Sequence, residues 1–276
     1  MSSTSSSYST EKGADRMARA LVTGAGKRLG RAMALELARR GHDVAVHYAS
    51  SEDAAAEVVS EIEAMGRRAV ALHADLLVEG EVQTLLPRAA EALGGPILTL
   101  VNNASIFEYD KIDTATRESW DRHLESNLRA PFVLIQALAA QVPDPESDDN
   151  GEPVARGLAV NMIDQRVRKL TPEFMSYTIA KSALWTLTRT AAQGLAPKVR
   201  VNGIGPGPTI IGHRQSDEHF RRQRQATVLQ RGADASDITA ALGYLLDARA
   251  VTGQLICVDG GQHLGWQTPD ILGVEP

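Results

Sequence analysis

The chain has 276 residues and a mass of 29.6 kDa, a length that favours one α/β domain with a large core. Its formal net charge of -5 provides no broad cationic surface, which argues against nucleic acid or an anionic membrane as a partner of the whole protein. The single cysteine, Cys257, excludes an internal disulfide framework and a cysteine-rich metal site. No apolar run is long enough to span a bilayer, and the N-terminus lacks the hydrophobic stretch of a secretory signal. We therefore expect a cytoplasmic protein that acts on a small molecule.

Residues 1–16 are rich in serine and carry no apolar periodicity, so they are predicted to form a disordered tail, while residues 17–276 form a single domain. Within this domain short apolar runs alternate with amphipathic stretches, a pattern typical of parallel strands joined by helical crossovers. The predicted strands are 18–22, 43–48, 69–73, 98–101, 157–162, 199–201 and 254–258. The predicted helices are 28–40, 52–65, 79–93, 117–128, 132–142, 174–195 and 235–246. The fold class is therefore α/β: a Rossmann-like, doubly wound parallel sheet of about seven strands with helices on both faces.

Two long segments without periodicity interrupt this alternation, residues 143–156 and residues 206–231. Loops of such length are uncommon in compact domains unless they are functional or mobile. The first segment is predicted to be a solvated excursion, and the second is predicted to be a lid over the substrate.

A glycine-rich turn, Thr23-Gly24-Ala25-Gly26-Lys27-Arg28-Leu29-Gly30, joins the first predicted strand to the first helix. Glycines allow a tight turn, and the free amides and dipole of a helix N-terminus attract phosphate. Leu29 occupies the last position of the general G-x-G-x-x-G pattern, so the support comes from the strand before the turn and the helix after it. We expect a dinucleotide phosphate to bind at Gly24, Lys27, Arg28, Leu29 and Gly30.

The end of the second strand reads His47-Tyr48-Ala49-Ser50-Ser51 and carries no acid, although a carboxylate usually stands there in NAD-preferring sites. The hydroxyls of Ser50 and Ser51, together with Lys27 and Arg28, could instead hold a ribose phosphate. This favours NADPH over NADH. Glu52 and Asp53 follow at once, and they are predicted to complement the positive end of the next helix.

Tyr177 and Lys181 are four residues apart, with Asp164 thirteen residues before the tyrosine. On a helix this spacing places the phenol and the ammonium on one face, where the positive charge is predicted to lower the tyrosine pKa and to make the phenol a usable general acid. Taken alone, the pair is also compatible with a surface tyrosine and a solvated lysine.

These motifs together resemble the short-chain dehydrogenase/reductase family from about Ala18 to Gly261. The resemblance implies an adenine contact at Asp75-Leu76, further cofactor contacts at His47, Tyr48, Asn103, Ala104, Ser105, Pro206 and Gly207, and a catalytic set of Asn127, Tyr177 and Lys181. In it Lys181 also binds the nicotinamide ribose and Asn127 holds a water in a proton relay. The resemblance further implies a homotetramer, built largely through the helix that carries Tyr177 and the helix before it. One stripe of that helix could serve either this interface or the internal core: Ala180, Leu184, Leu187 and Ala191.

Two departures from the family pattern resemble the pteridine reductases, including the dihydromonapterin-type reductases. Arg28 replaces a glycine of the turn, and Asp164 stands where most members have the catalytic serine. In that subgroup an aromatic residue at the position of Phe107 stacks a pterin against the nicotinamide, and the positions of Ser105 and Arg28 contact cofactor phosphate and substrate. The substrate-binding set implied is Arg28, Ser105, Phe107, Asp164 and Tyr177.

The chemistry of Asp164 supports a pterin, because an ionised aspartate cannot donate a hydrogen bond to a carbonyl as serine does. A partly dry site would raise its pKa enough to hold a proton for a ring nitrogen. The alternative is a capping or salt-bridged carboxylate near Arg166 or Arg168. Those arginines, like Arg221, Arg222 and Arg224, are predicted to be solvated, and no metal is expected because the histidines show no ligand spacing.

Three functions stay open at this point. The first is an NADPH-dependent pteridine reductase, and the second is a carbonyl or 3-oxoacyl reductase of the same family. The third is a protein that binds NADP(H) as a sensor or scaffold without turnover, although a pure binder has no need of Asn127, Tyr177 and Lys181.

Overall fold

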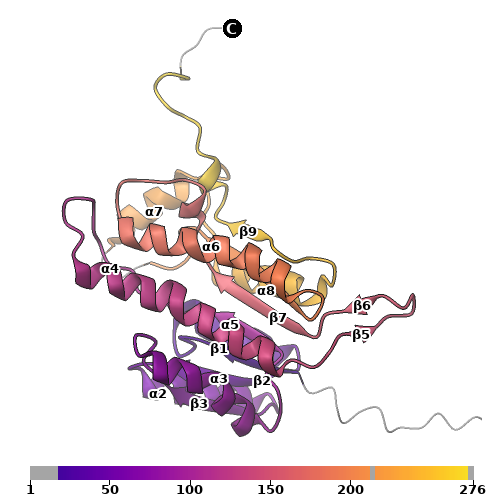
Figure 1. Ribbon diagram of the computed structural model, residues 1–276. Helices are drawn as coiled ribbons and strands as arrows, with labels where there is room; N and C mark the ends of the chain where they lie inside the picture. The colour runs from indigo at the N-terminus through magenta and orange to yellow at the C-terminus, as the bar shows by residue number, and fades with distance from the viewer. Residues whose placement is uncertain (1–17, 212–214, 273–276) are drawn as a thin grey trace, which may run out of the picture.

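A computed structural model describes residues 18–211 and 215–272, so the predicted tail at residues 1–16 lies outside the described residues. Its main sheet has seven parallel strands in the order β3-β2-β1-β4-β7-β8-β9 (Figure 1). The strands are β1 (Arg19–Val22), β2 (Asp43–Tyr48), β3 (Ala69–His73), β4 (Thr99–Asn102), β7 (Gly157–Met162), β8 (Val199–Pro206) and β9 (Leu255–Val258). The predicted doubly wound sheet is confirmed. The strand order reverses between β1 and β4, and the crevice at the carboxyl ends there is where such folds bind ligands.

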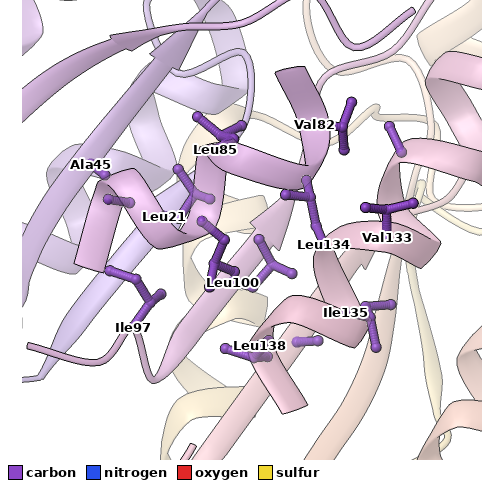
Figure 2. Packing of buried hydrophobic residues seen from close by; sticks show 14 of the residues in the cluster. Leu21, Ala45, Val82, Leu85, Ile97, Leu100, Val133, Leu134, Ile135 and Leu138 are labelled. Atoms are coloured by element: carbon purple, nitrogen blue, oxygen red, sulfur yellow. The ribbon is translucent and has the colours of Figure 1, made fainter. Parts of the chain in front are cut away.

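Helices cover both faces of the sheet, as predicted. They are α1 (Arg28–Arg39), α2 (Glu52–Ala64), α3 (Glu79–Leu93), α4 (Arg117–Leu124), α5 (Ala130–Gln141), α6 (Met175–Leu195), α7 (Asp217–Gln225) and α8 (Ala235–Asp247). One core cluster packs α3, α5 and the end of α6 on the sheet, with Leu21, Leu85, Leu100 and Leu134 at its centre (Figure 2). A second cluster packs α1, α2 and α8 on the opposite face. Each strand is therefore covered by apolar side chains on both sides, which explains its continuous apolar sequence.

The predicted helix 117–128 is wrong in its last turn. Helix α4 ends at Leu124, and a π-helical segment, η2 (Glu125–Arg129), leads into α5. Pro131 lacks the N–H that would bond the carbonyl of Asn127 in a continuous α-helix, so the backbone widens at this point. The π-helical turn holds Asn127 fully buried beside the site.

The two segments without periodicity are only partly irregular. Residues 143–156 contain a small antiparallel hairpin of β5 (Glu146–Ser147) and β6 (Pro153–Val154), which projects from the body of the protein (Figure 1). Residues 206–231 contain α7, while residues 212–214 lie outside the described part of the chain. Both polar segments therefore contain short regular elements that their sequences did not predict.

The apolar stripe of α6 serves the internal core. Ala180 and Leu184 are fully buried, and Leu187 and Ala191 pack against buried clusters of the same chain. No helix within residues 18–211 and 215–272 is long and apolar enough to cross a membrane.

Candidate active site

A cleft of about 570 Å³ opens at the carboxyl ends of the strands, where the strand order reverses. The glycine turn and the end of β2 form one side, and the segments after β7 and β8 form the other. Lys27, Arg28 and Arg166 are its cations, and Asp164 is the only carboxylate among the described residues that line it. The cleft therefore has a positive balance of charge that suits an anionic ligand.

The glycine turn is braced from β4. Thr23 Oγ1 accepts hydrogen bonds from the amides of Asn103 and Ala104 at 2.9 and 3.0 Å, and Asn103 Nδ2 donates to Thr23 O at 2.8 Å. A Cβ atom at Gly30 would lie 2.5 Å from Asn103 Nδ2 and would overlap the carbonyl oxygen of Gly24. The backbone at the start of α1 therefore packs directly against the glycine turn. Such close packing is typical of a turn that binds a dinucleotide phosphate.

His47 holds the other side of this turn. Its Nδ1 accepts the Gly24 amide at 2.9 Å, and its Nε2 lies 2.9 Å from Ala74 O, which requires the neutral ring with the proton on Nε2. Burial lowers the pKa of His47 from 6.5 to about 4. His47 therefore fixes the glycine turn through these two hydrogen bonds, and its predicted cofactor contact stays a prediction.

The lowered pKa of His47 predicts that the free energy of unfolding depends on pH. The unfolded chain takes up a proton near pH 6.5 and the folded protein only near pH 4, so the stabilisation is complete above about pH 6.5 and is lost as the pH falls toward 4. Its full size is roughly 3 kcal/mol. Urea unfolding of the parent at pH 7 and pH 5 should show the loss. His47→Asn, which keeps an acceptor for Gly24 without titrating, should show a smaller one. An equal pH dependence in the two proteins would exclude His47 as its source.

The end of β2 presents Tyr48, Ser50 and Ser51 to the cleft, which Lys27 of the glycine turn also lines. Glu52 and Asp53 lie in the first turn of α2, as predicted, and neither lines the cleft. A ribose phosphate at this end would meet hydroxyls and a cation, with the Glu52 carboxylate nearby on the Tyr48 side chain.

Arg28 crosses the cleft. Its guanidinium donates to Ile211 O at 2.7 Å and Ile210 O at 2.9 Å, and its backbone has a positive φ of 53°, a conformation that favours glycine. The arginine therefore fastens the segment after β8 to the glycine turn. Pro206 and Gly207, which the resemblance implies as cofactor contacts, line the cleft beneath this segment.

Asp75 and Leu76 do not line the cleft. Leu76 is buried in the core cluster that includes α3, and Asp75 Oδ1 accepts the amide of Leu77 at 2.9 Å. Asp75 directly follows Ala74, whose carbonyl oxygen lies 2.9 Å from His47 Nε2, and the implied adenine contact stays a prediction.

Asp164 and Tyr177 form a hydrogen-bonded pair. The Tyr177 hydroxyl donates to Asp164 Oδ2 at 2.9 Å, and Asp164 Oδ1 accepts the amide of Arg166 at 2.8 Å. The predicted capping role is present, because one oxygen caps the 3-10 turn η3 (Gln165–Val167), and the other oxygen meets the phenol. Burial raises the pKa of Asp164, as predicted. The pair can hold a proton at the edge of the cleft.

The predicted effect of Lys181 on the tyrosine is wrong in this structure. Burial and the neighbouring Asp164 carboxylate raise the pKa of Tyr177 well above its usual value. Lys181 is 2% exposed, and its ammonium donates to Met162 O at 2.7 Å. Burial lowers the pKa of Lys181 to about 8. Helical spacing placed the lysine near the phenol, but the strand backbone takes its hydrogen bond.

Asn127 fixes the loop after β4. Its Nδ2 donates to Ile106 O at 2.9 Å and its Oδ1 accepts the Ile106 amide at 3.1 Å, so the side-chain amide binds protein backbone. The next residue, Phe107, lines the cleft and is 48% exposed. Its ring stacks on Phe174 at 4.2 Å and meets Tyr177 edge-on at 4.7 Å. Phe107 is therefore a presented aromatic surface, placed beside the phenol by Asn127.

A buried polar chain supports this arrangement and escaped the sequence prediction. His123 Nδ1 lies 2.6 Å from Ser176 Oγ, which donates to Asp110, and His123 Nε2 accepts the Glu108 amide. The chain joins α4, the loop of Phe107 and the first turn of α6, next to Tyr177. Its residues are far apart in sequence and show no motif that could have identified them.

Two further residues of the cleft directly follow Asp164. Gln165 and Arg166 both line it, and Gln165 Oε1 and Arg166 Nε are buried without a hydrogen-bond partner among the described residues. Arg166 was predicted to be solvated. Arg224 is also not free, because it donates to Pro208 O and Ala233 O and pairs with Asp234. Cys257 lies in β9 with its pKa raised to about 11 by burial, which agrees with an unreactive thiol.

The strand order, the braced glycine turn at the reversal point and the buried proton-holding pair define a dinucleotide-dependent oxidoreductase with a Rossmann-type fold.

Comparison with known proteins gives the family. A family model described as enoyl-(acyl carrier protein) reductase matches residues 24–263. The 3-oxoacyl-[acyl-carrier-protein] reductase FabG of Staphylococcus epidermidis is 31% identical over 250 residues, which cover 89% of this chain and 98% of that relative. FolM alternative dihydrofolate reductase 1 from Brucella suis, solved in complex with NADP, is 43% identical with a TM-score of 0.85, covering 92% of this chain and 98% of that one. A blue fluorescent protein from a metagenomic library, solved with NADPH, is 32% identical with a TM-score of 0.80, covering 89% and 97%. The chain belongs to the short-chain dehydrogenase/reductase family.

Proposed function

We propose that this oxidoreductase reduces a pteridine, adding hydride to the carbon and a proton to the nitrogen of a carbon–nitrogen double bond in a dihydropterin. The observation that carries the proposal is the 2.9 Å hydrogen bond between Tyr177 and Asp164. A carboxyl group with a raised pKa, bonded to a phenol, can deliver a proton to a ring nitrogen. The FolM relative, described as an alternative dihydrofolate reductase, supports a pteridine substrate.

The cofactor is NADP(H), and it supplies the hydride when bound. The glycine turn, braced by Thr23, His47 and Asn103, offers the amides that hold its phosphates. Structures of relatives solved with NADP or NADPH support this cofactor.

The residues of the cleft would bind the substrate and transfer the proton. Phe107 would stack the pterin ring, and Ser105 and Arg28 would contact it at its edges. The Asp164 carboxyl group, hydrogen-bonded by the Tyr177 phenol, gives its proton to the ring nitrogen, and water in the open cleft returns a proton to the carboxylate. Lys181, charged below its pKa of about 8, would bind the nicotinamide ribose. The side chain of Asn127 keeps the loop of Phe107 in place. We place the water of the proton relay at the backbone of Asn127.

Lys27 provides a test of the cofactor preference. It is exposed at the mouth of the cleft, where its ammonium would meet a ribose phosphate. Lys27→Ala should weaken NADPH binding by about tenfold and leave NADH binding unchanged, because only NADPH carries that phosphate. Fluorescence titration with both cofactors measures the effect, with Lys198→Ala, in the loop before β8, as the control. An equal loss for both cofactors would place Lys27 at the shared pyrophosphate instead.

A second candidate is reduction of a carbonyl or a 3-oxoacyl group. The FabG relative supports it, and so does the hydroxyl of Ser105, which interacts with Tyr177 and could polarise a carbonyl in place of the missing serine.

NADPH consumption by the purified protein separates the candidates. Dihydrobiopterin and dihydromonapterin should support turnover, beside ketones, quinones and a 3-oxoacyl thioester as competing substrates and NADH as the cofactor control. Turnover of carbonyls alone would assign the second candidate, and NADPH binding without turnover of any acceptor would assign the sensor or scaffold.

Three expectations accompany the proposal. We propose a homotetramer, a cytoplasmic location, and a lid formed by residues 206–231. Pro208, Thr209, Ile210 and Phe220 of that segment line the cleft, which supports contact with the substrate.

A further inference from the structure

Arg166 brings a positive charge to the proton-holding pair. It follows Asp164 directly, and its backbone amide bonds to Asp164 Oδ1 at 2.8 Å because the aspartate caps the 3-10 turn η3. Its charge favours the ionised forms of both Asp164 and Tyr177. The arginine therefore acts on both members of the pair from one side.

The guanidinium is held in place without being neutralised. Arg166 Nη1 donates to Thr171 Oγ1 at 2.6 Å, and its Cζ lies 5.1 Å from the centre of the Phe174 ring. Arg166 forms no salt bridge with a carboxylate of residues 18–211 or 215–272, and its Nε is buried without an acceptor. A hydroxyl and an aromatic face orient the charge, and neither cancels it.

The other groups around the pair are less suited to balance its charge. Lys181 Nζ lies 5.7 Å from the centre of the Tyr177 ring, but it donates to Met162 O and acts more weakly than Arg166 on Asp164. His123, 6.0 Å from the Tyr177 ring, is held neutral by burial, and the Cys257 thiol is neutral because burial raises its pKa to about 11. The Ser105 hydroxyl carries no charge. Arg166 is thus the permanent cation beside the pair.

We propose that Arg166 balances the negative charge that Asp164 and Tyr177 gain when they give up their proton, the part that sequence spacing assigns to Lys181. The inference rests on the proposed function only in taking this pair as the proton donor. Arg166 acts on the substrate only through the effect of its charge on Asp164 and Tyr177, so it is a positioning residue and not a catalytic residue.

The first test uses the free protein, without cofactor or substrate. Carbon-13 NMR of the Asp164 carboxyl group, assigned with Asp164→Asn, gives its titration midpoint in the parent and in three variants. Arg166→Gln should raise the midpoint by about one pH unit, because a nearby cation favours the carboxylate. Arg166→Lys should stay close to the parent. Arg168→Gln, which removes an equal charge from the exposed end of the same turn, should leave the midpoint unchanged. An unchanged midpoint in a folded Arg166→Gln would overturn the proposal.

The second test is the pH dependence of kcat/KM for whichever acceptor the enzyme reduces. Because the protonated pair is the active form, activity falls as the pH rises through its pKa. Arg166→Gln should move this alkaline limb to higher pH and lower the plateau by about tenfold, since the deprotonated product state loses its counter-charge. Thr171→Val keeps the charge and removes its anchor, so it should lower the plateau less. A lower plateau with an unmoved limb would show a purely structural role for Arg166. If no pterin is reduced, the proposed function fails, while the NMR titration still decides the place of Arg166.

Discussion

Replacing Asp164 by serine is expected to lower kcat/KM for a dihydropterin by about 10²–10⁴-fold, the range for loss of a positioned proton donor. The affinity for NADPH should stay within a few-fold, because the glycine turn and the end of β2 are untouched. Serine restores a neutral hydroxyl donor, so turnover of ketones relative to pterins should rise. NADPH consumption and fluorescence titration measure the two effects, and Asp164→Asn, similar in shape but unable to give a proton, is the control. Equal turnover of a dihydropterin by Asp164→Ser and the parent would remove Asp164 from the mechanism.

Tyr177→Phe should cause a loss of similar size, and the double variant should be little worse than either single variant. The reason is that Tyr177 and Asp164 act through one hydrogen bond to deliver one proton, so removing the second group causes little further loss once the first is gone. Losses that add in full would instead indicate two separate proton donors.

The strands of the sheet could be predicted from the sequence because the inner strands are buried on both faces, the edge strands β3 and β9 are partly buried, and each reads as an apolar run. The exception is the end of β8, predicted to stop at Val201 but extending to Pro206. Gly203 lacks a side chain because the space is filled, and a Cβ atom there would overlap Ile163 Cδ1. In the sequence Gly203 suggests a turn, but in the structure it allows close packing beside the site.

The site could be predicted where its residues lie in one segment, as in the glycine turn and the Tyr177 helix. The contacts of the charged side chains and the pKa values of the site could not be predicted in this way. The contacts of Arg166 with Thr171 and Phe174 depend on how η3 folds back toward α6, and the burial that raises the pKa of Tyr177 depends on the loop of Phe107. Helical spacing predicts only which side chains of one helix can meet. It could not predict that Lys181 donates instead to Met162 O, which belongs to strand β7.

Gly30→Ala is expected to weaken NADPH binding by about 10–100-fold, through the loss of phosphate hydrogen bonds. The added methyl group would overlap the carbonyl oxygen of Gly24 and lie 2.5 Å from Asn103 Nδ2, both of which belong to the braced turn. Neither can retreat freely, since Asn103 also bonds to Thr23 and the Gly24 amide bonds to His47. The turn must therefore shift away from its phosphate-binding position, and the free energy of unfolding should fall by about 1–3 kcal/mol.

Gly194→Ala is the matched control, because Gly194 also lies in a helix and a Cβ atom there meets nothing within 4 Å. Alanine is the better helix former, so this variant should be as stable as the parent or more stable by up to about 1 kcal/mol, with unchanged NADPH binding. Urea unfolding and fluorescence titration of both variants separate the cost of a crowded turn from the general effect of a methyl group. Normal NADPH binding by a destabilised Gly30→Ala would show that the turn can shift without losing its phosphate contacts, and would limit the close packing at Gly30 to a role in folding.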